Sequence, residues 1–364
     1  MSEKRTFSTT TYYTSEEQLA KLFDATARRG GLEASTLEGY QAWKAKTAAD
    51  LRAITGLDQL VRCSMEPKLL STEQMDGYVR EKRLIQTEEG VWMPFYVLVP
   101  DGVKPGEKRA CIITPHGHAS GGKYSPAART DIPAIADAVE EYNYGYGEAF
   151  VRRGLIVFCP DARGFGERRE AGLQRDDESA FLHSTCTALN HVAISLGRSL
   201  TGLWTWDLMR LVDYAETRED CDAARIGCAG LSGGGLQTLW LAAMDERVRC
   251  AVVSGYFYGY KDSLLKQPHH CGCNYVPRLW NYVDMGDIAA LIAPRALLIE
   301  TGTMDPLNGE RGVANVTEQL AITRQAYELL GREDRLQHHL FEGGHRWDGA
   351  AAYPFAERWL AGGA

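Results

Sequence analysis

The chain has 364 residues, of which 45% are hydrophobic and 24% charged, enough for one large folded domain with an extension. Its net charge of −8 argues against a nucleic-acid-binding surface, and no run approaches the roughly 20 apolar residues of a membrane span. The first ten residues lack the apolar segment of a secretory signal, and the nine cysteines are scattered. We therefore expect a cytoplasmic protein with reduced thiols.

Residues 1 to about 75 have a helical pattern. Ser15 is followed three residues later by Gln18, which predicts a capping box, and residues 36–54 form a second helical stretch. We expect a helical extension over residues 1–75 that packs on the main domain or joins two copies of the chain. Residues 76–364 would form the catalytic domain.

From about residue 78 the pattern becomes that of strands alternating with helices. A hairpin is predicted first, followed by apolar strands and amphipathic helices. The predicted strands are 79–87, 91–100, 110–115, 155–160, 225–229, 250–254, 296–300 and 336–341, and the main predicted helices are 132–153, 203–216, 236–244, 316–330 and 350–360. This order predicts an α/β fold with a mostly parallel sheet, antiparallel strands at one edge and helices on both faces.

The sequence Gly230-Leu-Ser-Gly-Gly234 is a G-x-S-x-G motif between a predicted strand and a predicted helix. In that setting a sharp turn exposes the serine hydroxyl at the strand tip, and only small neighbours fit around it. We therefore predict that Ser232 is a nucleophile and that the amide of Gly233 donates to the oxyanion.

A serine nucleophile needs a base and an orienting acid, which on this kind of sheet follow the serine on loops after later strands. His345 is the histidine that follows the last predicted strand, so we predict that it is the base. Asp305 lies on the loop after strand 296–300 and is the favoured acid. Glu300, nearer the strand end, is the alternative.

The second oxyanion donor should come from the loop after strand 110–115. That loop reads His116-Gly117-His118, where a small residue lets the backbone approach a substrate oxygen closely. We predict that the amide of His118 is the donor and that His116 and Gly117 contact substrate.

Together these pieces resemble the α/β-hydrolase fold, and more closely its acetyl xylan esterase and dienelactone-hydrolase-like branch. The resemblance covers roughly residues 75–360 and rests on Pro115-His-Gly-His118, Asp161-Ala-Arg-Gly-Phe-Gly-Glu167, Gly230-Leu-Ser-Gly-Gly-Gly235, residues 293–305 and Gly343-Gly-His345. It implies that Ser232, Asp305 and His345 form the triad and that small acyl groups are removed from carbohydrate esters. Many esterases of this branch that attack plant polysaccharide are exported, whereas we expect this chain to be cytoplasmic. A cytoplasmic enzyme would meet imported oligosaccharides or small esters, and not the polymer.

Other features have two interpretations each. His269, His270, Cys271 and Cys273 include metal-ligand types, but because no matching second pair is visible we favour a pocket wall and expect no metal. Tyr256 and Tyr258 would bind substrate or belong to the core, and Arg163 would line the site or form a structural ion pair. Residues 256–285 would form a fixed wall or a moving lid.

We expect a serine carboxylesterase that cleaves esters of small acyl groups, acetyl above all, without a cofactor, acting on a small ester or an acetylated oligosaccharide. The alternative with the same triad is a peptidase or amidase, although such enzymes on this fold commonly carry a large extra domain. A non-catalytic scaffold would be expected to lack a triad member, and all three are present.

Overall fold

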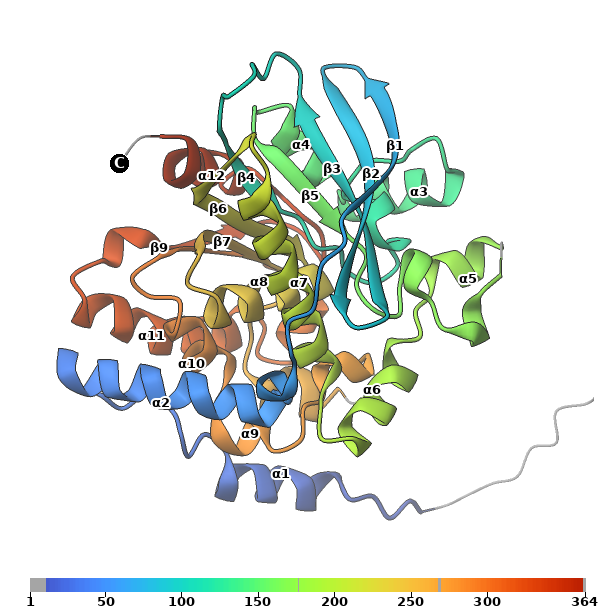
Figure 1. Cartoon of the computed structure of the whole chain (residues 1–364). Helices are drawn as coiled ribbons and strands as arrows, with labels where there is room; N and C mark the ends of the chain where they lie inside the picture. The colour runs from blue at the N-terminus through green and yellow to red at the C-terminus, as the bar shows by residue number, and fades with distance from the viewer. Residues whose placement is uncertain (1–10, 176, 268–269, 363–364) are drawn as a thin grey trace, which may run out of the picture.

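The computed structural model describes residues 11–175, 177–267 and 270–362. Within these ranges nine strands form one sheet in the order β1-β2-β3-β5-β4-β6-β7-β8-β9 (Figure 1). Pairing is antiparallel from β1 to β5 in this order and parallel from β5 to β9. The strands are β1 Lys68–Met75, β2 Tyr78–Glu88, β3 Val91–Pro100, β4 Arg109–Ile113, β5 Ile156–Pro160, β6 Cys221–Leu231, β7 Val248–Ser254, β8 Ala296–Gly302 and β9 Leu336–Phe341.

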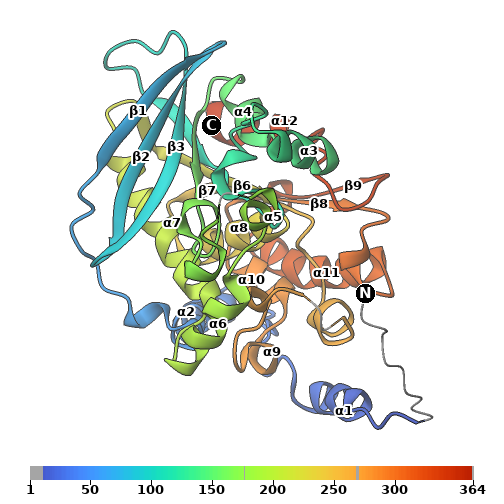
Figure 2. The same cartoon turned by 90° about the vertical axis from the view of Figure 1, so that its right-hand side faces the viewer.

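Helices cover both faces of the sheet (Figure 2). α3, α4 and α12 contribute to the apolar core on one face, and α7, α8, α10 and α11 contribute to the core on the other. The helices are α1 Glu16–Thr26, α2 Leu37–Thr55, α3 Pro133–Tyr142, α4 Tyr146–Val151, α5 Glu178–Leu182, α6 Cys186–Ser195, α7 Leu200–Thr217, α8 Gly233–Met244, α9 Leu279–Tyr282, α10 Met285–Ala290, α11 Val313–Leu329 and α12 Ala352–Ala356. The predicted α/β architecture is therefore confirmed.

The central strands are apolar because both faces of the sheet are covered. β5 and β8 are buried at every position, whereas the edge strand β1 is exposed along almost its whole length. All twelve residues of α8, which follows β6 directly, are buried. These buried elements form a rigid support for the loops at the carboxyl ends of the parallel strands.

The N-terminal region differs from the prediction in two details. Residues 68–75 form β1, which pairs with β2, so the helical part ends before the main sheet begins. Ser15 precedes α1, but its side chain makes no capping hydrogen bond. α2 packs on the main body, where the Tyr40 hydroxyl donates to the carbonyl of Ala290 (2.8 Å). That these helices join two copies of the chain stays a prediction.

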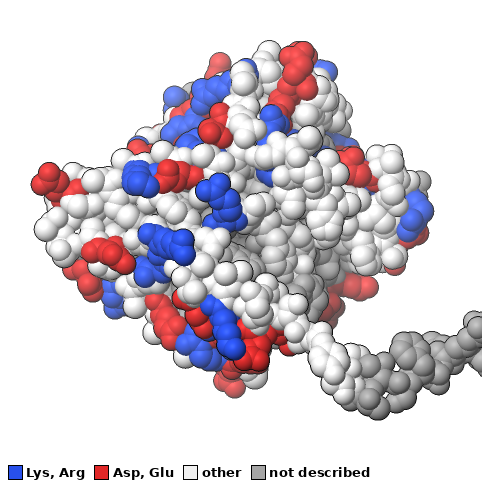
Figure 3. Space-filling model, turned by 90° about the horizontal axis from the view of Figure 1, so that it is seen from below, with Lys and Arg blue, Asp and Glu red and all other residues white. Residues whose placement is uncertain are grey.

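Basic and acidic side chains are interspersed on the face seen in Figure 3, rather than gathered by sign. Every helix within the described ranges is too short or too polar to cross a membrane.

Candidate active site

Ser232 occupies the sharp turn between β6 and α8. Its φ of 60° and ψ of −122° place it in a strained region that non-glycine residues rarely adopt. The glycines around it are required by space, because a Cβ on Gly230 would lie 2.5 Å from the backbone of Gly234. A Cβ on Gly234 would lie 2.2 Å from the carbonyl oxygen of Pro115. The predicted strand, turn and helix are thus present.

His345 and Asp305 lie together on the loops after β9 and β8. The Asp305 Oδ2 atom is 2.7 Å from Nδ1 of His345, and Oδ1 accepts a hydrogen bond from the amide of Leu307 (2.9 Å). The imidazole also packs against Gly255, where an added Cβ would lie 3.0 Å from Cε1. Gly255 is next to Ser254, whose carbonyl accepts a hydrogen bond from the amide of Ser232 (2.9 Å). The packing of His345 on Gly255 therefore brings the imidazole close to the serine turn.

Glu300, the alternative acid, has different partners. Its buried carboxylate accepts hydrogen bonds from the Ser254 hydroxyl (2.8 Å) and from the amides of Asp348 and Gly349 (both 3.0 Å). Burial raises the pKa of Glu300 even though these three donors favour the charged form. The carboxylate that the structure brings to His345 is therefore that of Asp305.

The loop after β4 lies against the serine turn, as predicted. An added Cβ on Gly117 would lie 3.0 Å from Cβ of Ser232, and one on Gly233 would lie 3.0 Å from Nδ1 of His118. The Tyr144 hydroxyl donates to the carbonyl of His118 (2.8 Å) and holds the loop. Burial, together with nearby histidines, lowers the pKa of His118 to about 4, so its ring is neutral at pH 7.

His116 has a different position from the one expected for a substrate-binding residue. Its Nε2 accepts a hydrogen bond from the amide of Ala162 (3.1 Å), so Nδ1 carries the proton and donates to the carbonyl of Gly117 (2.9 Å). The side chain is buried, and burial lowers its pKa. His116 therefore links the loop after β4 to the backbone at Ala162 and stabilises that loop.

Arg163 is part of a buried ion network instead of the cavity wall. It makes a two-pronged contact with Asp207 (2.9 and 2.8 Å) and a further contact with Glu88 (2.7 Å). Burial opposes the charge on Asp207, but Arg163 and Arg168 outweigh it and hold the pKa of that carboxyl well below its usual range. Of the two interpretations of Arg163, the structure shows the ion pair.

A cavity of about 240 Å³ opens beside Ser232. Gly233 and His118 line it next to the serine, and Tyr256 and Tyr258 line it as well. The Tyr256 hydroxyl donates to the side-chain oxygen of Asn274 (2.8 Å), so this tyrosine is held in place. Leu236 and Leu307 add apolar surface, which leaves a small and partly apolar space.

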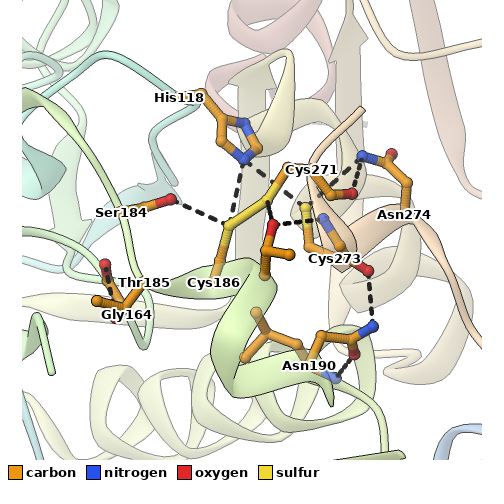
Figure 4. The surroundings of a disulfide bond; sticks show 12 residues. His118, Gly164, Ser184, Thr185, Cys186, Asn190, Cys271, Cys273 and Asn274 are labelled. Carbon is orange, nitrogen blue, oxygen red and sulfur yellow. Dashed lines mark hydrogen bonds between the residues drawn. A yellow bond between two sulfur atoms is a disulfide. The ribbon is translucent and has the colours of Figure 1, made fainter. Parts of the chain in front are cut away.

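Cysteines complete the wall of this cavity. The prediction that all nine are reduced thiols is wrong in the structure, because Cys186 and Cys271 form a disulfide (Figure 4). Cys271 and Cys273 line the cavity beside His270, while His269 lies outside the described residues. Sequence reasoning missed Cys186, which is 85 residues from Cys271, since no local pattern links it to the site.

Comparison with known proteins identifies the family. Residues 8–348 match the model of the Abhydrolase family. The chain belongs to this family. This Abhydrolase chain is 27% identical over 224 residues to a protein named "Putative hydrolase YtaP" from Bacillus subtilis (strain 168). The aligned region covers 60% of this chain and 69% of that protein.

Solved structures show the same fold. A "putative acetyl xylan esterase" from Bacteroides fragilis NCTC 9343 superposes with a TM-score of 0.71 at 18% identity, over 91% of this chain and 83% of that one. A glucuronoyl esterase from Solibacter usitatus has a TM-score of 0.61 at 17% identity, over 91% and 96% of the two chains. The Abhydrolase chain therefore has the α/β-hydrolase fold.

Proposed function

We propose that this chain is a serine carboxylesterase that removes small acyl groups, acetyl above all, from carbohydrate esters. The observation that carries the proposal is the pairing of Asp305 with His345 at 2.7 Å beside the strained turn of Ser232. A family assignment to hydrolases and a fold shared with carbohydrate esterases support it.

The proposed reaction uses a covalent acyl-enzyme. Nε2 of His345 takes the proton of the Ser232 hydroxyl as its oxygen attacks the ester carbonyl. Asp305 holds the proton on Nδ1 of His345, so that Nε2 is the basic nitrogen, and stabilises the imidazolium that forms. His345 then protonates the leaving alcohol, and water repeats the cycle to release the acid.

Two backbone amides would stabilise the oxyanion. The Gly233 amide begins α8, and the His118 amide belongs to the loop that packs on Gly233. Removing one such donor typically costs about 2.7–4 kcal/mol of transition-state stabilisation. The bonds from Tyr144 and from Gln237, whose Nε2 donates to the carbonyl of His116 (2.9 Å), would keep the loop in register.

The cavity beside the serine supports the choice of a small acyl group. A space of about 240 Å³ that is lined by Tyr256 and Tyr258 suits a small acyl group such as acetyl. We also propose a cytoplasmic location, because seven of the cysteines are free thiols.

The test is a series of p-nitrophenyl esters from acetate to octanoate, with acetylated xylo-oligosaccharide and an aminoacyl anilide alongside. We expect a steep fall in kcat/KM beyond propionate, with acetate released from the sugar. A flat or rising series without sugar activity would contradict the acetyl and carbohydrate assignment. Faster cleavage of the anilide than of any ester would replace the esterase by an amidase.

A further inference from the structure

Four metal-ligating side chains from three distant segments meet beside the cavity (Figure 4). His118 follows β4, Cys186 begins α6, and Cys271 and Cys273 lie in the turn before α9. One ligand atom from each lies within 4.8 Å of every other. Three sulfur atoms and one imidazole nitrogen form one of the sets that build structural zinc sites.

The spacing around His118 matches a tetrahedral site. Its Nε2 atom is 3.7 Å from Sγ of Cys186 and 3.7 Å from Sγ of Cys273. With metal–sulfur bonds of about 2.3 Å and a metal–nitrogen bond of about 2.0 Å, tetrahedral geometry separates nitrogen and sulfur by about 3.5 Å. In the disulfide form the two contacts are long hydrogen bonds, and their lengths are close to the edge of a coordination tetrahedron.

The disulfide uses only two of the four groups. Its Cα atoms are 7.0 Å apart, beyond the usual range of about 4.4–6.8 Å for disulfide-bonded cysteines. A single ion between the four side chains would engage Cys273 and His118 as well. Apart from this pair, seven cysteines are free, which is the usage typical of a reducing compartment.

Each sulfur atom also has a polar neighbour able to donate a hydrogen bond. The hydroxyl of Ser184 is 3.0 Å from Sγ of Cys186, and that of Thr187 is 3.5 Å from Sγ of Cys271. The side-chain amide of Asn274 donates to Sγ of Cys273 at 3.7 Å. Such donors lower the energy of thiolates bound to a metal and orient them.

We propose that, when Cys186 and Cys271 are reduced, His118, Cys186, Cys271 and Cys273 bind one zinc ion. A dithiol reductant supplies the two electrons and two protons that convert the disulfide into two thiols, and it leaves as its own disulfide. Zinc binding then releases one proton from each of the three thiols. Because the protein supplies all four ligands, the ion holds structure and does not contact substrate.

The ion would fasten the walls of the cavity to one another. It joins the loop that carries the His118 amide to α6 and to the turn that contains Cys271. For catalysis, the consequence rests on the proposed function: the ion would keep the His118 amide aimed at the oxyanion. His118 would then act through its backbone on the reaction and through its ring on the metal.

The test measures zinc bound to the purified, reduced full-length chain by mass spectrometry of its metal content. We expect about one zinc per chain, and a loss of at least tenfold in zinc affinity for Cys273→Ser. Cys63→Ser is the matched control, because Cys63 is a free, half-buried thiol outside the cluster, and it should bind zinc like the wild type. Zinc retained by Cys273→Ser, or absent from the reduced wild type, would overturn the proposal.

A second measurement covers the case in which Cys273→Ser fails to fold. Cobalt added to the reduced wild type should give the intense thiolate-to-metal absorption and the visible bands of a tetrahedral site. Absence of these bands would also overturn the site. Ester hydrolysis by a reduced wild type that takes up no zinc would contradict the metal proposal alone, whereas zinc binding without hydrolysis would contradict the esterase proposal alone.

Discussion

The two sides of the cavity are built in different ways. On the serine side, Ser232, Asp305 and His345 each follow a strand of the central sheet within a few residues, so local sequence places them. On the cysteine side, Cys186 lies on a short helix and meets Cys271 across 85 residues of chain. The first side depends on backbone geometry at strand ends, and the second depends on how loops pack over the sheet.

This difference predicts two kinds of residue, those proposed to react and those that hold the site. The strained turn at Ser232 persists because β6 and the fully buried α8 fix both of its ends. The cysteine side has no such frame of its own and relies on cross-links between loops. Substitutions on the serine side should therefore change kcat, whereas substitutions in the supporting networks should change stability.

The largest effect is expected for Ser232→Ala. Loss of the nucleophile should lower kcat for p-nitrophenyl acetate by about 10⁶-fold, by analogy with other serine hydrolases. The melting temperature should stay close to that of the wild type, because the methyl group fits where the hydroxyl was. Retained turnover in this variant would show that another residue is the nucleophile.

Asp305→Asn should have the next largest effect. The amide keeps the shape of the side chain but favours the wrong tautomer of His345, which typically lowers kcat by about 10⁴-fold. The measurement is kcat at neutral pH, with circular dichroism to verify folding. A decrease of less than tenfold would mean that the 2.7 Å contact is structural.

Arg163→Gln should mainly reduce stability. Removing this cation leaves Asp207 and Glu88 with fewer partners in a buried network, and we expect the free energy of unfolding to fall by about 3 kcal/mol. The KM for ester substrates should not change. Arg175→Gln is the matched control, since its pair with Asp177 is exposed to solvent and should contribute little to stability. A raised KM with unchanged stability in Arg163→Gln would place Arg163 in the substrate site.

Glu300→Gln should have the smallest effect. Its effect on the free energy of unfolding should depend on pH. The amide keeps one acceptor for the three donors, so we expect a loss of about 1–3 kcal/mol in unfolding free energy. Because the folded pKa of Glu300 is raised, the folded chain keeps a proton that the unfolded chain has already lost. The wild type therefore loses stability as pH rises from the ordinary glutamate pKa through the raised one.

Glu300→Gln has no proton to lose and should lack this decline. Urea unfolding at several pH values would measure the free energy of unfolding of both proteins. The difference in this free energy between wild type and variant should shrink as pH rises. A kcat reduced as strongly as in Asp305→Asn would instead assign Glu300 a direct part in the chemistry.

The sequence was informative wherever one short segment determines its own geometry. The glycines of residues 230–235 allow only a sharp turn, and the apolar runs of β5 and β8 predict buried strands. The positions of His345 and Asp305 after their strands followed from the same reasoning. Strand periodicity did not reveal β1, because an exposed edge strand has no apolar face to mark it.

By itself, the sequence determined the α/β architecture, the serine turn and the loops that bear the histidine and the acid, because these are local consequences of residue type and spacing. Only the tertiary structure decided that Asp305 rather than Glu300 contacts His345, and that Arg163 and His116 serve as supports. It alone brought Cys186 and His118 to Cys271 and Cys273. Contacts of this kind depend on how distant loops pack on a common sheet, and the spacing of residues along the chain contains no record of that packing.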